Sequence, residues 1–329
     1  MKKAVAGLVF LLAAALIGST GAVAQTELKF ADALPKTFSY YPAMVAFKDT
    51  VDKTGKLTIR LFPEGVLGDQ KALLEATKVG SVDIAVVASQ VSQQLVPEHG
   101  IFGLPFVWLK HEDYLKFLQG PIAAELGKKM EPHGLKVIVF ADGGSLAVLN
   151  SKRPVRTPED MKGLKLRVMQ DPMQVDMIKA MGAIPVPMGT PEVYSAIQQG
   201  QIDGNATSVQ LLWALKNYEV AKQLSVTNHG RAAGVVIMNL KKWNALDADQ
   251  KRALEAGAKT FFNVDAEYYT TSASTASPRV VTQMASSGVV VSEPDIAAFR
   301  TATLPVVLAF KNRVKSPLVD QALKEAGVQ

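Results

Sequence analysis

Arg167 is the side chain with the clearest chemical use in this sequence. It lies near the end of a run, Leu164–Val168, in which apolar and charged residues alternate with the period of a half-buried strand. Asp171 and Pro172 follow, and these residue types are typical of a helix N-cap and of the first helical position. In open α/β sheets, ligands bind at this kind of junction. A guanidinium there is a planar, charged fork that suits a carboxylate or a phosphate, although a solvated arginine at a strand edge fits the same position.

The catalytic and metal-binding motifs in the chain are incomplete. His111 begins a zinc-protease-like run, but Leu115 stands where the second histidine is needed. Residues 143–147 resemble a nucleophile elbow around Ser145, with Ala147 in place of its last glycine. The chain has four histidines and no cysteine, and it contains no phosphate loop and no dinucleotide fingerprint. We therefore expect no catalytic residue, no cofactor and no metal site.

The first 24 residues have the pattern of a secretory signal peptide. Two lysines precede the apolar run Ala4–Ile17, and small residues end at Ala24. We expect cleavage after Ala24, so that the mature chain begins at Gln25. Since no cysteine follows Ala24, a lipoprotein anchor is excluded, and an exported chain without cysteines indicates the bacterial periplasm.

The charge and hydropathy of the rest of the chain exclude two classes of partner. The formal net charge is +6, and the sequence shows no basic block interleaved with aromatic residues, so we expect no nucleic acid. No later apolar run reaches the ~18 residues that span a bilayer. The strongest, Ile101–Leu109, is short and holds Gly103 and Pro105, which favours a buried strand or a core loop. Without the expected signal peptide the chain has about 300 residues, a length that predicts two domains.

The elements that must position the candidate site alternate between strand and helix. The sequence predicts strands over 27–31, 57–62 and 82–87, with helices over 42–54 and 69–79. This rhythm is typical of βαβ units in a largely parallel sheet.

The later elements are less regular. A buried strand over 135–140, a break over 142–145 and a return to strand over 147–150 precede the run that holds Arg167. A helix is expected over 211–224, and a long helical region begins at Asp247.

Several motifs occur in an order that resembles one family over almost the whole mature chain. The motifs are Leu61–Val87, Leu104–Phe106, Asn150–Val168, Pro187–Met188, Glu192–Tyr194, Asp203–Gly204, Thr227–His229, and Trp243 with Asp249–Gln250. Together they resemble the DctP-like solute-binding proteins of TRAP (tripartite ATP-independent periplasmic) transporters. The resemblance implies a two-lobed α/β periplasmic-binding-protein fold, type II-like, that closes as a Venus flytrap and has a long helix spanning both lobes. It also implies a small organic acid as ligand and a permease with a small and a large membrane subunit, driven by an ion gradient.

The resemblance also implies which parts of the chain form each of the two lobes. Residues 25–145 and 234–275 are expected in lobe I, and residues 146–233 and 276–329 in lobe II. Hinge strands are expected near 141–148 and 231–236.

The ligand site that the resemblance implies rests on Arg167, which pairs with the ligand carboxylate in most relatives. Three positions depart from the family pattern: Leu146 replaces a second arginine, Thr207 replaces an asparagine, and Arg231 stands where relatives often carry an aliphatic or aromatic residue. The ligand is therefore expected to have a less charged far end than a sialic acid. Arg231 is expected on a lobe surface, or alternatively as a second cation for a dicarboxylate. The expected ligand-binding residues are Arg167, Thr207, Ser89, Gln90, Tyr40, Leu146, Gln170, Thr190 and Arg231.

Two other functions fit the same sequence less well. A sensory protein that presents its closed, carboxylate-bound form to a receptor has the same binding lobes. A periplasmic hydrolase using Ser145 lacks a base and an orienting group around the nucleophile.

Overall fold

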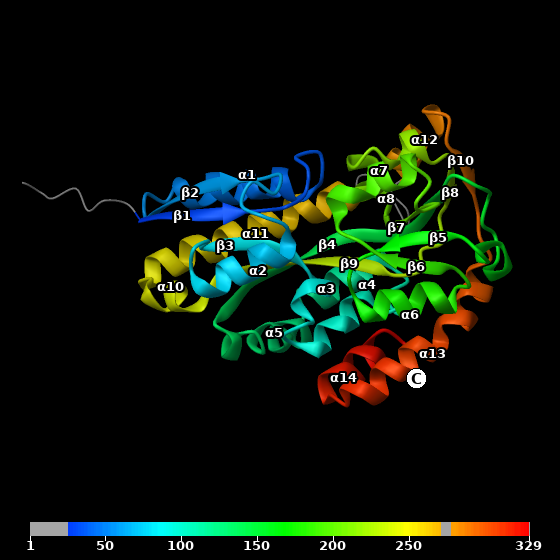
Figure 1. The fold of residues 1–329 in the computed structure, drawn as a ribbon. Coiled ribbons are helices and arrows are strands. Elements are labelled where there is room, and N and C mark those ends of the chain that lie inside the picture. The colour runs from blue at the N-terminus through cyan, green and yellow to red at the C-terminus, as the bar shows by residue number, and fades with distance from the viewer. Residues whose placement is uncertain (1–25, 271–277, 329) are drawn as a thin grey trace, which may run out of the picture.

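The computed structural model describes residues 26–270 and 278–328. Its strands are β1 Thr26–Ala31, β2 Leu57–Phe62, β3 Ile84–Ala88, β4 Leu135–Asn150, β5 Lys165–Val168, β6 Ile184–Pro187, β7 Gly204–Ser208, β8 Gln223–Ser225, β9 Arg231–Asn239 and β10 Val290–Ser292. They form a 10-stranded sheet in the order β2-β1-β3-β9-β4-β7-β5-β6, with β8 paired to β4 and β10 paired to β8. Figure 1 shows helices on both faces of this sheet.

The α-helices cover the sheet in chain order. They are α1 Tyr40–Asp52, α2 Gln70–Val79, α3 Ser89–Ser92, α4 His111–Leu118, α5 Pro121–Lys128, α6 Pro172–Ala180, α7 Val193–Gln198, α8 Val209–Ala214, α9 Asn217–Val220, α10 Leu240–Ala245, α11 Ala248–Thr270, α12 Pro278–Ser286, α13 Ile296–Val314 and α14 Pro317–Glu325. The 3-10 helices are η1 Pro97–Gly103, η2 Glu131–His133, η3 Pro158–Met161 and η4 Thr190–Glu192.

The sheet has two parallel parts joined by two long antiparallel strands. In the first lobe β1 pairs in parallel with β2 and β3, and in the second lobe β5 pairs in parallel with β6 and β7. Strand β4 pairs with β9 up to Ser145 and with β7 from Leu146 onward, so one strand runs through both lobes (Figure 1). The two-lobed α/β fold expected from the sequence is confirmed.

The break expected over residues 142–145 is wrong, because β4 continues through it. The register between β4 and β9 shifts between Asp142 and Ser145, which makes a bulge. Oδ1 of Asp142 accepts a hydrogen bond of 2.8 Å from the backbone N–H of Gly144, and Gly144 has a positive φ of 88°. Two glycines therefore bend the strand without ending it.

Each lobe has apolar cores on both faces of its part of the sheet. Along β3, Ile84 and Val86 belong to one core of the first lobe, whereas Ala85 and Val87 belong to the other, as the alternation of a strand requires. The second lobe has its own two cores, and Met177 of α6 lies in one of them. The methionines of this helix therefore pack as core residues.

The two longest helices of the described residues, α11 and α13, each extend from one lobe toward the other. Figure 1 shows α11 running along the first lobe, where it packs on α1, toward the second lobe. The continuation expected into the 280s falls partly on residues 271–277, outside the described residues, and α12 beyond them packs on α8. Helix α13 has Phe299 in a core of the second lobe and Phe310 in a core of the first. Since α14 packs against α5 and η1, we propose that the chain returns to the first lobe within α13.

Two local expectations differ from the structure. The helix expected over 211–224 is instead α8, α9 and the short strand β8, because Lys216 adopts a left-handed conformation with φ of 55° that interrupts it. The apolar run from Ile101 enters a core as the end of η1 and the loop after it, which confirms the core-loop alternative. Among the described helices, none has the length and apolar character needed to cross a bilayer.

Candidate functional site

A cavity of about 360 Å³ lies between the lobes at the carboxyl ends of the parallel strands. The first lobe contributes the loops after β1 and β2, the start of α2, and α3. The second lobe contributes the loops after β5 and β6, together with Leu215. The lining residues are Ala33, Leu34, Pro35, Glu64, Gly65, Gly68, Asp69, Gln70, Lys71, Gln90, Val91, Gln94, Arg167, Met169, Gln170, Asp171, Met188, Gly189, Thr190, Pro191 and Leu215.

Arg167 is held in this cavity by the loop that follows β6. Its side chain is 2% exposed; Nε donates to the carbonyl oxygen of Met188 at 3.0 Å, and Nη2 donates to Oγ1 of Thr190 at 3.2 Å. No carboxylate of the described chain forms an ion pair with it. Burial lowers the pKa of Arg167 to about 10, so the guanidinium stays charged at neutral pH. These bonds fix the plane of the guanidinium and leave its Nη1 end for an anion.

The carboxylates that line the cavity already have donors. Oε2 of Glu64 pairs with Lys36 at 3.2 Å, and Oδ1 of Asp69 accepts from the N–H of Ala72 at 2.8 Å. Asp171 caps α6, where it accepts from the N–H groups of Met173 at 3.1 Å and Gln174 at 3.3 Å. This confirms the N-cap predicted from the sequence.

The polar groups opposite Arg167 come from the first lobe. Gln90 lies in α3 directly after β3 and is 4% exposed. Gln70, at the start of α2, accepts from the N–H of Ala88 with Oε1 at 2.7 Å, which ties α2 to the end of β3. Lys71 lies beside it, is exposed, and is the second cation among the described residues that line the cavity.

The structure brings four of the residues expected at the site into the cavity wall: Arg167, Gln90, Gln170 and Thr190. Ser89 is buried next to Gln90. The other expected residues lie outside the lining of this cavity. Leu146 packs in an apolar core with Val148, and Thr207 pairs with Ala147 across β7 and β4.

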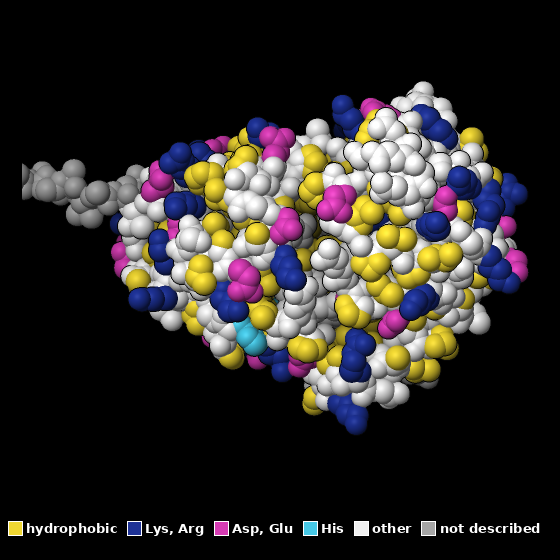
Figure 2. Space-filling view, in the orientation of Figure 1, with side chains coloured by type: hydrophobic (Ala, Val, Ile, Leu, Met, Phe, Trp, Pro, Cys, Tyr) yellow, Lys and Arg dark blue, Asp and Glu magenta, His cyan; other side chains and the backbone are white. Residues whose placement is uncertain are grey.

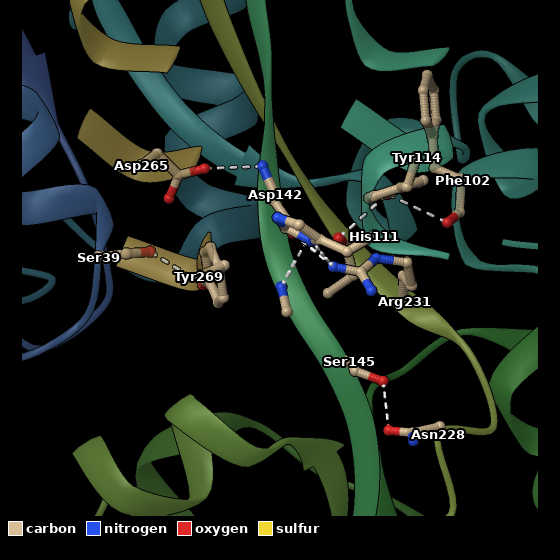
Figure 3. A network of polar contacts seen from close by, with 12 residues as sticks. Ser39, Phe102, His111, Tyr114, Asp142, Ser145, Asn228, Arg231, Asp265 and Tyr269 are labelled. Carbon is tan, nitrogen blue, oxygen red and sulfur yellow. Dashed lines mark hydrogen bonds and ion pairs between the residues drawn. The ribbon is translucent and has the colours of Figure 1, made fainter. Parts of the chain in front are cut away.

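Tyr40 and Arg231 both lie at the strands that join the lobes. A Cβ added to Gly234 of β9 would stand 2.5 Å from the hydroxyl oxygen of Tyr40, so the tyrosine packs on the backbone of that strand. Arg231 is 5% exposed, and its Nη2 lies 2.5 Å from Oδ2 of Asp142 and 2.8 Å from Nδ1 of His111 (Figure 3). The expectation of a lobe-surface arginine is therefore wrong, because Arg231 is a buried partner of Asp142.

Several residues of the cavity wall were not predicted from the sequence, notably Lys71, Met169, Asp171 and Met188. Asp171 was recognised as a helix cap, and the signal for its second position was present, since it follows the strand that carries Arg167. The loop after β6 carries no comparable signal. It reaches Arg167 through the backbone carbonyl of Met188, which any residue type supplies, and through the hydroxyl of Thr190, which was expected at the site.

Neither a metal centre nor a nucleophile elbow is formed by the residues described. They contain no group of three histidine, aspartate or glutamate side chains placed to hold a metal ion. Ser145 lies inside β4, and its Oγ donates to Oδ1 of Asn228 at 2.8 Å. Figure 2 shows basic and acidic side chains interspersed over the visible face of both lobes.

Comparison with known proteins agrees with the family resemblance of the sequence motifs. Residues 30–313 match the family described as "Bacterial extracellular solute-binding protein, family 7". The chain is 32% identical over 243 residues to the 2,3-diketo-L-gulonate-binding periplasmic protein YiaO of Escherichia coli, covering 73% of this chain and 74% of that protein.

Solved structures of similar proteins carry sugar acids. A TRAP periplasmic solute-binding protein from Sulfitobacter, with bound β-D-galacturonate, is 27% identical with a TM-score of 0.84 and covers 91% of this chain and 99% of its own. Another from Anaerococcus prevotii, with bound D-glucuronate, is 26% identical with a TM-score of 0.86 and covers 92% and 99%.

Proposed function

Because this chain belongs to family 7 of the bacterial extracellular solute-binding proteins, which serve TRAP transporters, we propose that it captures a hydroxylated organic acid in the interlobe cavity and delivers it to a TRAP permease. The proposal rests on a single observation, which is the environment of Arg167. This residue is a buried cation at the cavity wall without a carboxylate partner among the described residues. A buried charge without a partner is costly, so the site is built for an anion that supplies the missing charge.

The charges of the cavity favour one carboxylate per ligand. Two cations, Arg167 and Lys71, line the cavity together with the carboxyl groups of Glu64, Asp69 and Asp171. A second carboxylate on the ligand would meet more negative than positive groups, whereas hydroxyl groups could bond to Gln90, Gln170 and backbone carbonyls. This balance supports a monocarboxylate with a hydroxylated body, such as the hexose acids bound by similar proteins.

The binding proposal can be tested with a thermal-shift screen of the mature chain. We expect D-galacturonate, D-glucuronate or a related aldonate to raise the melting temperature, and succinate to raise it less. A ligand present at 100 times its dissociation constant adds about 2.7 kcal/mol to the free energy of unfolding. If succinate stabilises the protein more than every hydroxylated acid, the preference for a monocarboxylate is wrong; if no acid stabilises it, the proposed function is wrong.

We further propose that the protein binds its ligand without altering it. The support is that the described residues place no base beside Ser145, whose hydroxyl donates to Asn228. The proton NMR spectrum of the ligand should therefore stay unchanged after long incubation with the protein. A spectrum that changes with time would contradict this.

Location and partners follow from the same proposal. Similar proteins are named as periplasmic, and we propose a periplasmic location after cleavage behind Ala24, followed by docking to a permease with a small and a large membrane subunit. Intact mass of the exported protein should correspond to a chain that begins at Gln25. Uptake of the acid into vesicles that hold the permease should depend on this protein and on an ion gradient, and should persist without ATP.

A further inference from the structure

Two segments of the chain cross between the lobes side by side, and both carry glycine where they cross. In β4 the crossing point is Gly143–Gly144, inside the bulge. In the neighbouring segment it is Gly230, whose carbonyl oxygen accepts from the N–H of Leu146 at 2.9 Å. Glycine permits backbone rotations that other residues resist, so both segments carry their conformationally most permissive residues at this level.

The glycine pair of β4 lies between two polar anchors. On one side Asp142 faces Arg231, and on the other side the Oγ of Ser145 donates to Asn228 at 2.8 Å (Figure 3). Asp142 and the residues before it pair with β9 in the first lobe, and the residues after Ser145 pair with β7 in the second. The bulge is therefore held at each end. Its two glycines are buried between these ends, where a Cβ added to Gly143 would stand 2.7 Å from the Cβ of Ala232.

Asp142 connects four elements. Its Oδ1 accepts from the N–H of Gly144 within β4, and its Oδ2 accepts from Nη2 of Arg231 in β9 at 2.5 Å. Oδ2 also lies 3.1 Å from Nδ1 of His111 at the start of α4. Its backbone N–H donates to Oδ2 of Asp265 in α11 at 2.8 Å. Figure 3 shows these groups converging on one point of β4.

Asp265 and Tyr114 also border this ion pair. Burial, together with the nearby charge of Asp142, raises the pKa of Asp265 well above its ordinary value. The ring of Tyr114 lies 4.9 Å from the guanidinium carbon of Arg231, and its hydroxyl donates to the carbonyl oxygen of Ala232 at 3.1 Å. Arg231 is thus held between an aromatic face and one carboxylate.

Stability alone does not explain this pair. Asp142 is fully buried and Arg231 is 5% exposed, and replacing such a pair with apolar residues is often neutral or stabilising. Nε of Arg231 and Nε2 of His111 lack hydrogen-bond partners within the described chain. Keeping these charges buried costs free energy. Because the pair lies where two crossing strands bend, it can specify one arrangement of those strands.

We propose that Asp142 and Arg231 are positioning residues for ligand capture. Their ion pair fixes the first-lobe end of both crossing strands. Rotation of the lobes is thereby confined to Gly143–Gly144 and Gly230, and the lobes meet in one closed geometry. The inference rests on the proposed function, since it assumes that the lobes close on a ligand.

The test compares Asp142→Asn with Asp83→Asn by pulsed electron spin resonance distances. Asp83 is a matched control in the first lobe: it is buried, accepts from the N–H of Lys29 at 2.8 Å and pairs with Lys242 at 2.5 Å. The chain has no cysteine, so spin labels at Glu75→Cys in α2 and Gln199→Cys after α7 report the separation of the lobes without background.

We expect a broader distance distribution for Asp142→Asn than for wild type without ligand, and a similar one for Asp83→Asn. With D-galacturonate we expect wild type and Asp83→Asn to narrow, and Asp142→Asn to stay broader and bind about tenfold more weakly. An unchanged ligand-free distribution for Asp142→Asn overturns the inference, as does equal broadening in Asp83→Asn. If wild type binds no acid, the proposed function fails. The ligand-free distributions still show whether the pair of Asp142 and Arg231 positions the crossing strands.

Arg231→Lys serves if Asp142→Asn does not fold. It keeps a cation beside Asp142 and loses the planar fork. We expect the ligand-free distribution to broaden here as well. A distribution equal to that of wild type would show that the fork does not position the strands.

Discussion

Gln93 and Asp171 join the two lobes directly: Nε2 of Gln93 donates a hydrogen bond to Oδ1 of Asp171. Gln93 follows α3 in the first lobe, and Asp171 is the N-cap of α6 in the second. Asp171 also lines the cavity, so this contact lies at its wall. The carboxylate that starts α6 therefore also holds the lobes together in the conformation described.

Gln93→Ala should weaken ligand binding without changing the site for the carboxylate. The substitution removes an interlobe bond to a carboxylate and leaves the cap of α6 in place, which a substitution of Asp171 would not do. A hydrogen bond of this type contributes about 1–2 kcal/mol, or roughly five- to thirtyfold in affinity. Calorimetric titration with D-galacturonate measures the loss. The control is Gln201→Ala, since exposed Gln201 bonds to Gln199 at the surface. Equal affinities for Gln93→Ala and Gln201→Ala would show that the hydrogen bond between Gln93 and Asp171 does not contribute to ligand binding.

Thr190→Val should weaken binding by a smaller factor. Valine keeps the shape of the side chain but cannot accept the hydrogen bond from Nη2 of Arg167. The guanidinium then loses one of its two supports, at about 0.5–1.5 kcal/mol, or roughly two- to tenfold in affinity. The matched control is Thr301→Val on the exposed side of α13, where the hydroxyl donates to the carbonyl oxygen of Ala297. Affinity equal to that of the control would show that Thr190 does not orient Arg167.

The sequence located Arg167 correctly at a strand end because the signals there are local. The alternating run, the N-cap at Asp171 and the proline after it all act within a few residues. The bond from Gln93 to Asp171 and the pair of Arg231 with Asp142 join residues 78 and 89 positions apart. No periodicity connects such residues, so the lobe contact was missed and Arg231 was assigned to the surface.

The course of β4 was missed for a different reason. Two glycines after an aspartate usually mark a turn, and a bulge uses the same residues. What distinguishes the two is the neighbouring strand, since β9 continues to pair with β4 on both sides of the shift. The sequence therefore indicates that residues 142–145 bend the chain. Whether they form a turn or a bulge depends on β9, which is distant in the sequence.

Asp32→Asn should change how stability depends on pH. Asp32 is 1% exposed, neither carboxylate oxygen meets the geometry of a hydrogen bond in the described chain, and burial raises its pKa from 3.8 to about 7, although the N–H groups of Leu34 and Ala33 partly oppose the rise. Because the folded state holds this proton more tightly, the contribution to stability is present below pH 3.8 and is lost as pH rises through 7.

This loss amounts to on the order of 4 kcal/mol between about pH 4 and pH 8. The asparagine side chain does not titrate, so the Asp32→Asn variant should lose less stability than wild type over that interval and be the more stable protein at about pH 8. Urea unfolding of both proteins at the two pH values measures the difference. Parallel pH profiles would show that Asp32 does not carry this proton in the folded state.

Arg167→Ala and Arg167→Lys should both lose most of the affinity for the acid. The Nη1 end of Arg167 is directed to the cavity by the bonds of Nε and Nη2 to Met188 and Thr190. A ligand carboxylate bound there is buried with the guanidinium, and truncating one member of such a pair costs about 2–5 kcal/mol. Affinity should therefore fall by roughly thirty- to several-thousand-fold in Arg167→Ala.

Lysine should not restore binding, because a single ammonium group can neither bond to both Met188 and Thr190 nor present a planar fork to the carboxylate. Arg60→Ala is the control, since Arg60 is exposed in β2 and lies outside the cavity wall. Circular dichroism should show that the three variants remain folded, and calorimetric titration with D-galacturonate then gives their affinities. If Arg167→Lys binds within about threefold of wild type while Arg60→Ala is unchanged, the carboxylate does not depend on the guanidinium fork, and the role proposed for Arg167 is wrong.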